Sequence, residues 1–278
     1  MTTVQEGLIA VSRHLQGRDV PNPAREARLL LAHAMGVAPD RVSLMAPDPL
    51  GDDALKDALA LAARRGAGEP ASHILGRRAF FGRDFHVDAR VLDPRPETEC
   101  LIVEALSQPF MSFLDLGTGS GAIAVALAAE RSDASGVATD LSEQAIVVAA
   151  QNAATHGVAD RIRFLVSDWY QALSGTFDLI VSNPPYIAAA EMAALQPEVR
   201  LYEPRMALTD EGDGLGAYRI IAAGAPDHLT PGGRLIVEIG PTQAQAVSRL
   251  MRDAGLGNIR IIPDLDGRDR VVVGHMAR

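Results

Sequence analysis

The chain reads Leu114-Asp115-Leu116-Gly117-Thr118-Gly119-Ser120-Gly121 at the end of a short apolar segment, and small helix-forming residues follow from Ala122 to Ala126. Glycine adopts the backbone angles of a tight turn at little cost and lets the main chain approach a ligand closely. A turn of this kind between a strand and a helix places a ligand at the carboxyl edge of a parallel sheet, beside a helix N-terminus. A plain turn needs one glycine, and this one holds three. The segment therefore predicts a strand, a cofactor-binding turn and a helix.

Further apolar segments lie on both sides of this turn and alternate with helical runs at the spacing of βαβ units. The expected strands are Ser112–Leu116, Gly136–Thr139, Ile162–Val166, Phe177–Val181, Arg234–Ile239, Ile259–Ile262 and Arg270–Gly274. Seven strands with helices between most of them predict an open, mostly parallel α/β sheet. This domain is expected to span residues 94–278 and to begin with a helix at Glu97–Ala105.

Residues 1–75 predict a small helical domain, because apolar residues recur there at helical spacing. Asn22-Pro23 provides an N-cap and a proline at the first helical position, and Gly36 stands where a C-cap belongs. A third helical run is expected to end at Arg64–Gly68. Between the two domains, residues 76–93 carry Phe80, Phe81 and Phe85 around Gly82 and predict a β-hairpin linker.

Composition excludes several classes of protein. The 278 residues are 47% hydrophobic and 22% charged, as in a folded globular protein. No apolar stretch approaches the roughly 20 residues that span a bilayer, and the N-terminus lacks the features of a signal or transit peptide, so we expect a cytoplasmic protein. The single Cys100 and the spacing of the histidines predict no disulfide and no metal site. A net charge of −9 disfavours binding to a nucleic-acid backbone.

The glycine turn leaves the cofactor open between two classes. Gly117, Gly119 and Ala122 also fit the loose dinucleotide-binding pattern, and Asp140, at the end of the second strand, can accept the ribose hydroxyls of either NAD or S-adenosylmethionine. Asp115 favours the second, because an acid beside the glycines suits a ligand with a cationic amino group better than a pyrophosphate. Asp115 and Asp140 each also have a purely structural interpretation.

The fourth strand runs into Asn183-Pro184-Pro185-Tyr186. Prolines fix the backbone and donate no hydrogen bond, so nearby carbonyls are left as acceptors, and the Asn183 side chain adds one more. Two acceptors can hold both hydrogens of a planar NH₂ group with its nitrogen facing the cofactor. Tyr186 is expected to stack on the flat group. The tetrapeptide therefore predicts a site that methylates nitrogen, although a proline-rich structural turn is the simpler alternative.

Asp168-Trp169, after the third strand, is expected to complete the cofactor pocket. The Asp168 carboxylate can accept from an adenine amino group, and the indole can cover the ring. Trp169 is otherwise interpreted as a core residue.

These motifs together resemble the release factor glutamine methyltransferases, the PrmC/HemK family of class I methyltransferases. The resemblance covers nearly the whole chain and includes further segments: Leu75-Gly76, Phe80-Phe81-Gly82, Pro94-Arg95-Pro96-Glu97-Thr98-Glu99, Ser167-Asp168-Trp169, Glu198-Val199-Arg200, Tyr202-Glu203-Pro204 and Asp213-Gly214-Leu215. One departure is Asp93, which stands where the family usually has an apolar residue; it is expected to change the packing of this connector and to leave the chemistry unaffected.

The resemblance implies a Rossmann-like methyltransferase domain joined by the hairpin to an N-terminal domain that helps recognise a protein substrate. It implies transfer of a methyl group from S-adenosyl-L-methionine, leaving S-adenosyl-L-homocysteine, to the side-chain N5 nitrogen of the glutamine in the Gly-Gly-Gln motif of peptide chain release factors. The cofactor contacts implied are Gly117, Thr118, Gly119, Ser120, Gly121, Asp140, Trp169 and Asn183, beside Asp115 and Asp168 from the pattern above. The substrate amide would be held by Asn183, Pro184, Pro185 and Tyr186.

Several alternatives stay open from the sequence. A sister activity on a glutamine of a ribosomal protein would use the same pocket. A nucleic-acid amino-group methyltransferase would need a basic cleft or an added recognition domain. An NAD-dependent dehydrogenase leaves Asn183–Tyr186 unexplained, and a non-catalytic adaptor leaves both sites unexplained.

Overall fold

The computed structural model describes residues 2–18 and 20–278, and its contacts divide the chain into two compact units. The smaller unit comprises Met1–Arg77 together with Gln196–Tyr202. The larger unit comprises Arg78–Leu195 together with Glu203–Arg278. The smaller unit is therefore assembled from two stretches of sequence that lie far apart.

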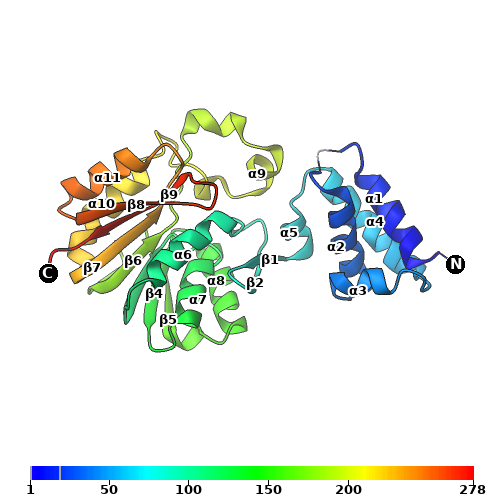
Figure 1. Ribbon diagram of the computed structural model, residues 1–278, viewed down its shortest axis with the longest axis horizontal. Coiled ribbons are helices and arrows are strands. Elements are labelled where there is room, and N and C mark those ends of the chain that lie inside the picture. The colour runs from blue at the N-terminus through cyan, green and yellow to red at the C-terminus, as the bar shows by residue number, and fades with distance from the viewer. Residues whose placement is uncertain (1, 19) are drawn as a thin grey trace. The chain divides into compact units, whose positions relative to one another are not determined.

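The smaller unit is helical, as the sequence predicts (Figure 1). Its helices are α1 (Val4–Leu15), α2 (Pro23–Met35), α3 (Pro39–Leu44), α4 (Asp52–Gly66), α5 (Ala71–Leu75) and α9 (Pro197–Tyr202). The caps predicted for α2 are confirmed: the Asn22 side chain accepts from the Arg25 N–H, Pro23 occupies the first turn, and Gly36 caps the end with a φ of 65°. Leu15, Leu30 and Leu31 are fully buried in its core.

Helix α9 belongs to the smaller unit although it follows the tetrapeptide in sequence. Glu198 of α9 pairs with Arg65 at 3.1 Å, and the guanidinium of Arg65 also binds Glu26. The Tyr202 hydroxyl donates to the carbonyl of Ala67 at 3.3 Å. These contacts attach α9 to the end of α4.

The expected hairpin is present as β1 (Arg77–Phe80) and β2 (Arg83–His86). Phe80 and Phe85 are buried in the core of the larger unit, with ring centroids 6.0 Å apart in an edge-to-face arrangement. The Asn152 side chain of α8 (Glu143–Thr155) accepts from the His86 N–H and donates to the His86 carbonyl. The hairpin is thus packed into the larger unit and is more than a flexible tether.

The larger unit is a three-layer α/β sandwich around a seven-stranded sheet with the order β5-β4-β3-β6-β7-β9-β8. The strands are β3 (Ser112–Leu116), β4 (Ser135–Asp140), β5 (Ile162–Val166), β6 (Phe177–Ser182), β7 (Leu229–Glu238), β8 (Gly257–Pro263) and β9 (Asp269–His275). The first five are parallel, whereas β9 is antiparallel to β7 and to β8. The predicted fold class is confirmed.

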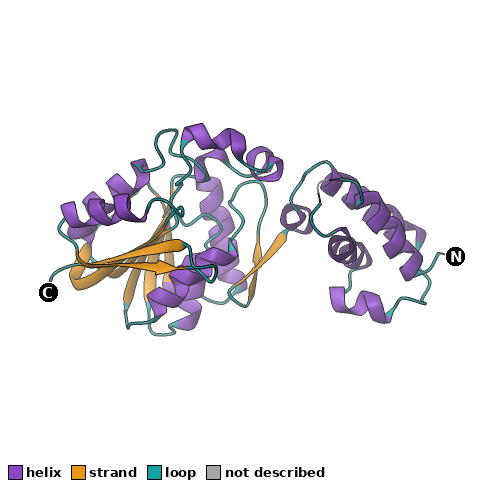
Figure 2. Ribbon diagram, turned by 45° about the horizontal axis from the view of Figure 1, so that its top comes forward, coloured by secondary structure: helices purple, strands orange, loops and turns teal. Residues whose placement is uncertain are grey.

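Helices cover both faces of the sheet (Figures 1 and 2). One face packs against α6 (Glu99–Leu106) and α7 (Ala122–Glu130), and α8 adjoins α7; the other face packs against α10 (Gly216–His228) and α11 (Ala244–Asp253). Short 3₁₀ helices are η1 (Pro96–Thr98), η2 (Ala159–Arg161), η3 (Ala189–Ala194) and η4 (Arg205–Ala207). Because every residue of α7 from Ala122 to Ala128 is buried, its lack of polar residues is explained by its central position.

All seven predicted strands are present, with ends that differ by a few residues. The largest difference is β7, which begins at Leu229 where Arg234 was expected, but its pairing with β6 is interrupted between Leu229 and Arg234. Pro231, Gly232 and Gly233 lie in that interval and weaken strand pairing, which explains why the pattern showed only the second half.

Candidate functional site

A cavity of about 710 Å³ lies in the larger unit at the carboxyl ends of β3, β4, β5 and β6. The chain leaves β3 toward β4 on one side, whereas β6 lies on the other, so the strand order reverses next to β3. Ligands of open α/β sheets bind at such a reversal point. The size of the cavity suits a cofactor together with a small part of a substrate.

The predicted glycine turn forms one wall of this cavity, through Gly117, Thr118, Gly119 and Ser120. Gly117, Gly119 and Gly121 all have positive φ values, of 71°, 55° and 80°. A Cβ atom on Gly121 would lie 2.9 Å from the Cβ of Ala149, so this glycine lets α7 and α8 pack closely and does not itself line the cavity. The turn is thus shaped both for a ligand and for helix packing.

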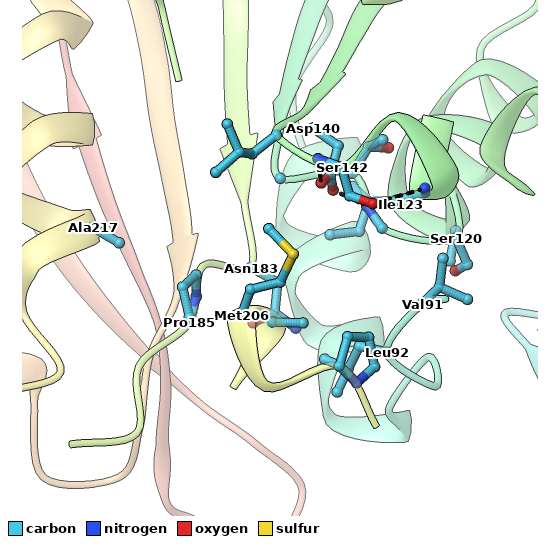
Figure 3. Close-up of a pocket in the computed structure, with 18 of the residues that line it drawn as sticks. Val91, Leu92, Ser120, Ile123, Asp140, Ser142, Asn183, Pro185, Met206 and Ala217 are labelled. Atoms are coloured by element: carbon cyan, nitrogen blue, oxygen red, sulfur yellow. Dashed lines mark hydrogen bonds between the residues drawn. The ribbon is translucent and has the colours of Figure 1, made fainter. Parts of the chain in front are cut away.

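Asp140 ends β4 and is held in a fixed orientation at the cavity wall. Its Oδ2 accepts from the Gly119 N–H and its Oδ1 from the Ser142 N–H, both at 2.9 Å. Burial raises the pKa of Asp140, against these two hydrogen bonds, which lower it. Figure 3 shows Asp140 and Ser142 on one side of the cavity, across from Asn183 and Pro185. The carboxylate is therefore pre-oriented to accept further hydrogen bonds from a ligand.

Asp115 lies beneath the glycine turn and does not line the cavity. It is fully buried, and its Oδ2 accepts from the Thr118 hydroxyl at 2.6 Å. Within residues 2–18 and 20–278, its Oδ1 has no hydrogen-bond partner. Burial raises the pKa of Asp115 to about 7, against the Thr118 hydroxyl and the Ala124 main-chain amide, which lower it, and with a small further increase from Asp140. The predicted contact with a cationic amino group would therefore have to act through the turn.

Asp168 and Trp169 both line the cavity, and Trp169 also packs against the core on the α10–α11 side. The sequence left Trp169 open between a cavity residue and a core residue, and its side chain lies against both the cavity and the core. Its backbone φ is 49°, which is uncommon outside glycine. The Ser167 hydroxyl donates to the Trp169 carbonyl at 2.9 Å and accepts from the Ala172 N–H, so this strained turn is held by its neighbours.

The tetrapeptide begins where β6 ends. Asn183 and Pro185 line the cavity, whereas Pro184 and Tyr186 do not. Asn183 Nδ2 donates to Thr98 Oγ1 at 3.2 Å. Tyr186 packs against the core of the sheet, and burial raises the pKa of its hydroxyl to about 12. The predicted stacking of Tyr186 on a substrate stays a prediction.

Two groups of lining residues were not assigned to the site from the sequence. One is the connector Val91–Arg95 with Thr98, and the other is the segment Pro204–Glu211, which includes Met206. Arg95 joins the two through its ion pair with the buried Glu203, at 2.6 Å. Both segments contain motifs that resemble those of the family, which marked them as functional. The linear sequence does not show that the two segments lie together at the cavity wall. Asp93, the noted departure, is buried at this wall.

The segment between Tyr186 and Gly214, which contributes Gln196–Tyr202 to the smaller unit, is closed at its two ends, here called the closed neck. Gln243 Nε2 donates to the carbonyls of Tyr186, at 2.9 Å, and Gly214, at 3.1 Å. A Cβ atom on Gly214 would lie only 2.4 Å from the Tyr186 carbonyl oxygen, so the two ends approach as closely as a glycine permits. Ile187 also donates to the Leu208 carbonyl.

Within residues 2–18 and 20–278, no group of three or more His, Cys, Asp or Glu side chains is arranged to hold a metal ion. Over the same residues, no helix combines the length and apolar character required to cross a membrane.

Comparisons with known proteins cover nearly the full chain. The family model for the PrmC N-terminal domain matches residues 6–76, and that for the methyltransferase small domain matches residues 96–215. The release factor glutamine methyltransferase of Cereibacter sphaeroides is 55% identical over 96% of both chains. That of Rhodospirillum rubrum is 45% identical over 91% of this chain and 79% of its own. Among solved structures, a methyltransferase from Pyrococcus furiosus matches with a TM-score of 0.55 and 19% identity, over 72% of this chain and 92% of that one.

Proposed function

The chain belongs to the release factor glutamine methyltransferases, and from this premise we propose that it methylates the glutamine side-chain nitrogen in the Gly-Gly-Gln motif of peptide chain release factors. The methyl donor is S-adenosylmethionine, which becomes S-adenosylhomocysteine. The observation that carries the proposal is that Asn183 and Pro185 line the same cavity as the glycine turn. Such a cavity can bring a planar amide and a methyl donor together.

The residues of the cavity fit this cofactor. Asp140 would hold the ribose hydroxyls, Asp168 the adenine amino group, and Trp169 would cover the adenine ring. The main chain at Gly117–Ser120 would approach the methionine portion, where a side chain on Gly119 would extend into open space. Asp115 would act from beneath, through its negative charge and its hydrogen bond to Thr118. When bound, the cofactor supplies a methyl group on a sulfonium, which is electrophilic.

The tetrapeptide would supply alignment and electrostatic stabilisation. An amide nitrogen is a weak nucleophile because its lone pair is delocalised, so the protein can help most by positioning it. Asn183 Oδ1 and a main-chain carbonyl of the Asn183–Tyr186 tetrapeptide would accept its two hydrogens, and these fixed acceptors would stabilise the positive charge that grows on nitrogen. No side chain needs to form a covalent intermediate.

The smaller unit would select the protein substrate. A glutamine side chain has too few atoms for its pocket to distinguish one protein among thousands, so the remaining binding energy must come from surfaces far from the amide. We therefore assign substrate recognition to residues 1–75, the hairpin linker to 76–93 and catalysis to 94–278. The enzyme would meet release factors in the cytoplasm, without sequence-specific binding to nucleic acid.

The test is methyl transfer to purified release factor, with fragmentation mass spectrometry to locate the added methyl group. We expect one methyl on the Gly-Gly-Gln glutamine and none on a release factor in which that glutamine is replaced by asparagine. Purified ribosomal proteins and RNA serve as competing substrates in parallel reactions. Faster transfer to either of these, or methylation at another release-factor residue, would overturn the substrate assignment.

A further inference from the structure

A row of three polar side chains, Glu238, Thr98 and Asn183, connects the end of β7 to the cavity. Asn183 Nδ2 donates to Thr98 Oγ1 at 3.2 Å, and the Thr98 hydroxyl lies close enough to the Glu238 carboxyl to lower its pKa. Strands β6 and β7 are parallel neighbours paired at Ser182 and Val237. The next residue of each strand, Asn183 and Glu238, therefore emerges at the same edge of the sheet, with Thr98 of η1 between their side chains.

Glu238 is a costly residue to bury. It is 1% exposed, and in the described part of the chain its Oε2 has no hydrogen-bond partner. The nearby Tyr218 hydroxyl donates to the main-chain carbonyl of Glu238 and not to its carboxyl. A buried carboxyl that lacks a full set of hydrogen bonds destabilises the fold unless it serves another purpose.

The proton count along this row of side chains sets the orientation of the Asn183 amide. A hydroxyl has one proton, and an ionised carboxylate can only accept. Thr98 must therefore donate to an ionised Glu238, and its oxygen remains as an acceptor toward Asn183. The NH₂ group of Asn183 then faces Thr98, and its carbonyl Oδ1 faces the opposite way. That is the orientation needed to accept a hydrogen from a substrate amide.

Protonation of Glu238 removes this constraint. A protonated carboxyl can donate to Thr98, whose own proton is then free to bind Asn183 Oδ1. The Asn183 amide can turn over, and its NH₂ group would then meet the NH₂ group of the substrate, donor against donor. Protonation of Glu238 thus decides whether Asn183 presents its carbonyl oxygen or its NH₂ group to the cavity.

Glu238 is able to titrate near neutral pH. Burial raises its pKa to about 7, although Thr98 and Arg270 lower it. The charged and titratable groups that face it are Arg270, Arg95, Glu97, Tyr186, Tyr218 and Cys100. The pKa values of the two tyrosines and the cysteine are raised, so these three groups stay neutral at pH 7 and the proton exchange belongs to Glu238.

We propose that Glu238 is a positioning residue which, when ionised, acts through Thr98 to fix the Asn183 amide with its carbonyl toward the substrate nitrogen. The proposal rests on the function proposed above and adds a regulated feature to it. Methyl transfer should proceed when Glu238 is ionised and fail when it is protonated. Thr98 is the link in this proposal, because its hydroxyl accepts from Asn183 and lies beside the Glu238 carboxyl.

The first test is the single-turnover rate of methyl transfer between pH 5.5 and 9, at saturating cofactor and release factor. Because Asp115 also has a pKa of about 7, the parent and all variants compared carry Asp115→Asn, and the rate of this parent should fall through one protonation with a midpoint near 7. Glu238→Gln should lose this step, and Thr98→Val should lose it and run at least tenfold slower at pH 8. Thr98→Ser keeps the hydroxyl and should keep both the rate and the step. A step that persists in Glu238→Gln, or a parental rate in Thr98→Val, would overturn the proposal.

A matched control is Glu104→Gln, another buried glutamate whose carboxylate instead pairs with Arg260. This variant should keep the parental pH profile, which separates the effect of Glu238 from that of any buried charge. If its profile loses the step as well, the assignment to Glu238 is wrong.

The second test does not depend on activity. In ¹⁵N-labelled protein, the side-chain amide signals of Asn183, assigned by their absence in Asn183→Ala, should shift with the same midpoint in the parent and stay constant in Glu238→Gln. If the enzyme methylates none of the substrates offered, this titration still decides the matter. Asn183 signals that do not respond to pH in the parent protein would refute the positioning role, even in a fully active enzyme.

Discussion

Replacing Asp115 with asparagine should stabilise the larger unit at pH 8. The folded-state pKa is about 7 against 3.8 for an exposed carboxyl, so keeping Asp115 ionised in the folded protein costs about 4 kcal/mol at pH 8. Asparagine can still accept from Thr118 through its oxygen, but its NH₂ group would replace the unpartnered Oδ1 and cost about 1–3 kcal/mol. The net gain should be about 1–3 kcal/mol.

The pH dependence has a definite sign. The folded protein holds a proton on Asp115 up to higher pH than the unfolded chain does, so the contribution is favourable below pH 3.8, declines as pH rises, and is lost above about 7. The advantage of Asp115→Asn should therefore grow between pH 5 and pH 8. A gain that is constant over this range would contradict the titration argument.

Asp178→Asn provides a control of opposite sign. Asp178 is partly exposed, and although burial acts to raise its pKa, hydrogen bonds from the Met111 and Ser112 N–H groups and from the Ser112 and Thr230 hydroxyls lower it overall. A lowered pKa means that the ionised form is favoured by folding, and this stability is present at neutral pH and lost in acid. Asp178→Asn should thus destabilise the unit at pH 8.

The assay is urea unfolding followed by the fluorescence of Trp169, the single tryptophan of the chain, which lies in the larger unit. Its signal reports on that unit even if the helical unit unfolds separately. Thermal unfolding should show Asp115→Asn higher by at least about 2 °C at pH 8, from about 2–4 °C per kcal/mol for a domain of this size. Equal or lower stability of Asp115→Asn at pH 8 would refute the reasoning.

Three further outcomes are expected from the site. Asp140→Ala should weaken S-adenosylmethionine binding at least tenfold in calorimetry, because charge-assisted hydrogen bonds contribute about 1.5–3 kcal/mol each; unchanged affinity in the folded variant would make Asp140 purely structural. Asn183→Ala should reduce the single-turnover rate at saturating cofactor far more than it reduces the melting temperature, and a parental rate would remove Asn183 from catalysis. A chain starting at Arg78 should bind cofactor but methylate release factor poorly, and full activity would refute the role of the smaller unit.

The sequence predicted the sheet well because its signals are local. Each strand is a short apolar run, and glycine at 117, 119 and 121 marks the turn whatever surrounds it. The helices α3, α5 and α9 were missed because five or six residues are too few to show a helical period. No local pattern could show that α9 joins the smaller unit, since its attachment depends on Arg65 and Ala67, more than a hundred residues away.

The sequence predicted some residues of the site and missed others. Residues at the ends of strands were found because parallel strands end at one edge, and this brought Asp140, Asp168 and Asn183 together as expected. Glu238 escaped notice because it stands near the end of an apolar strand predicted over Arg234–Ile239, where a charged residue is usually exposed to solvent. Its meaning appears only when burial and the contact with Thr98 are known.

The closed neck at Tyr186 and Gly214 has a consequence for how such enzymes diversify. Since Gln243 holds both ends of the 187–213 excursion, changes of length within it alter a loop whose closure is already secured. The entropic penalty of a longer loop rises only with the logarithm of its length, so doubling it costs about 0.6 kcal/mol. Insertions, deletions or a transplanted sequence between residues 193 and 202, which spare Glu203 and its ion pair with Arg95, should leave the geometry of Asn183 and Pro185 intact. Descendants of this protein could acquire new protein substrates by exchanging that stretch while the chemistry stays the same.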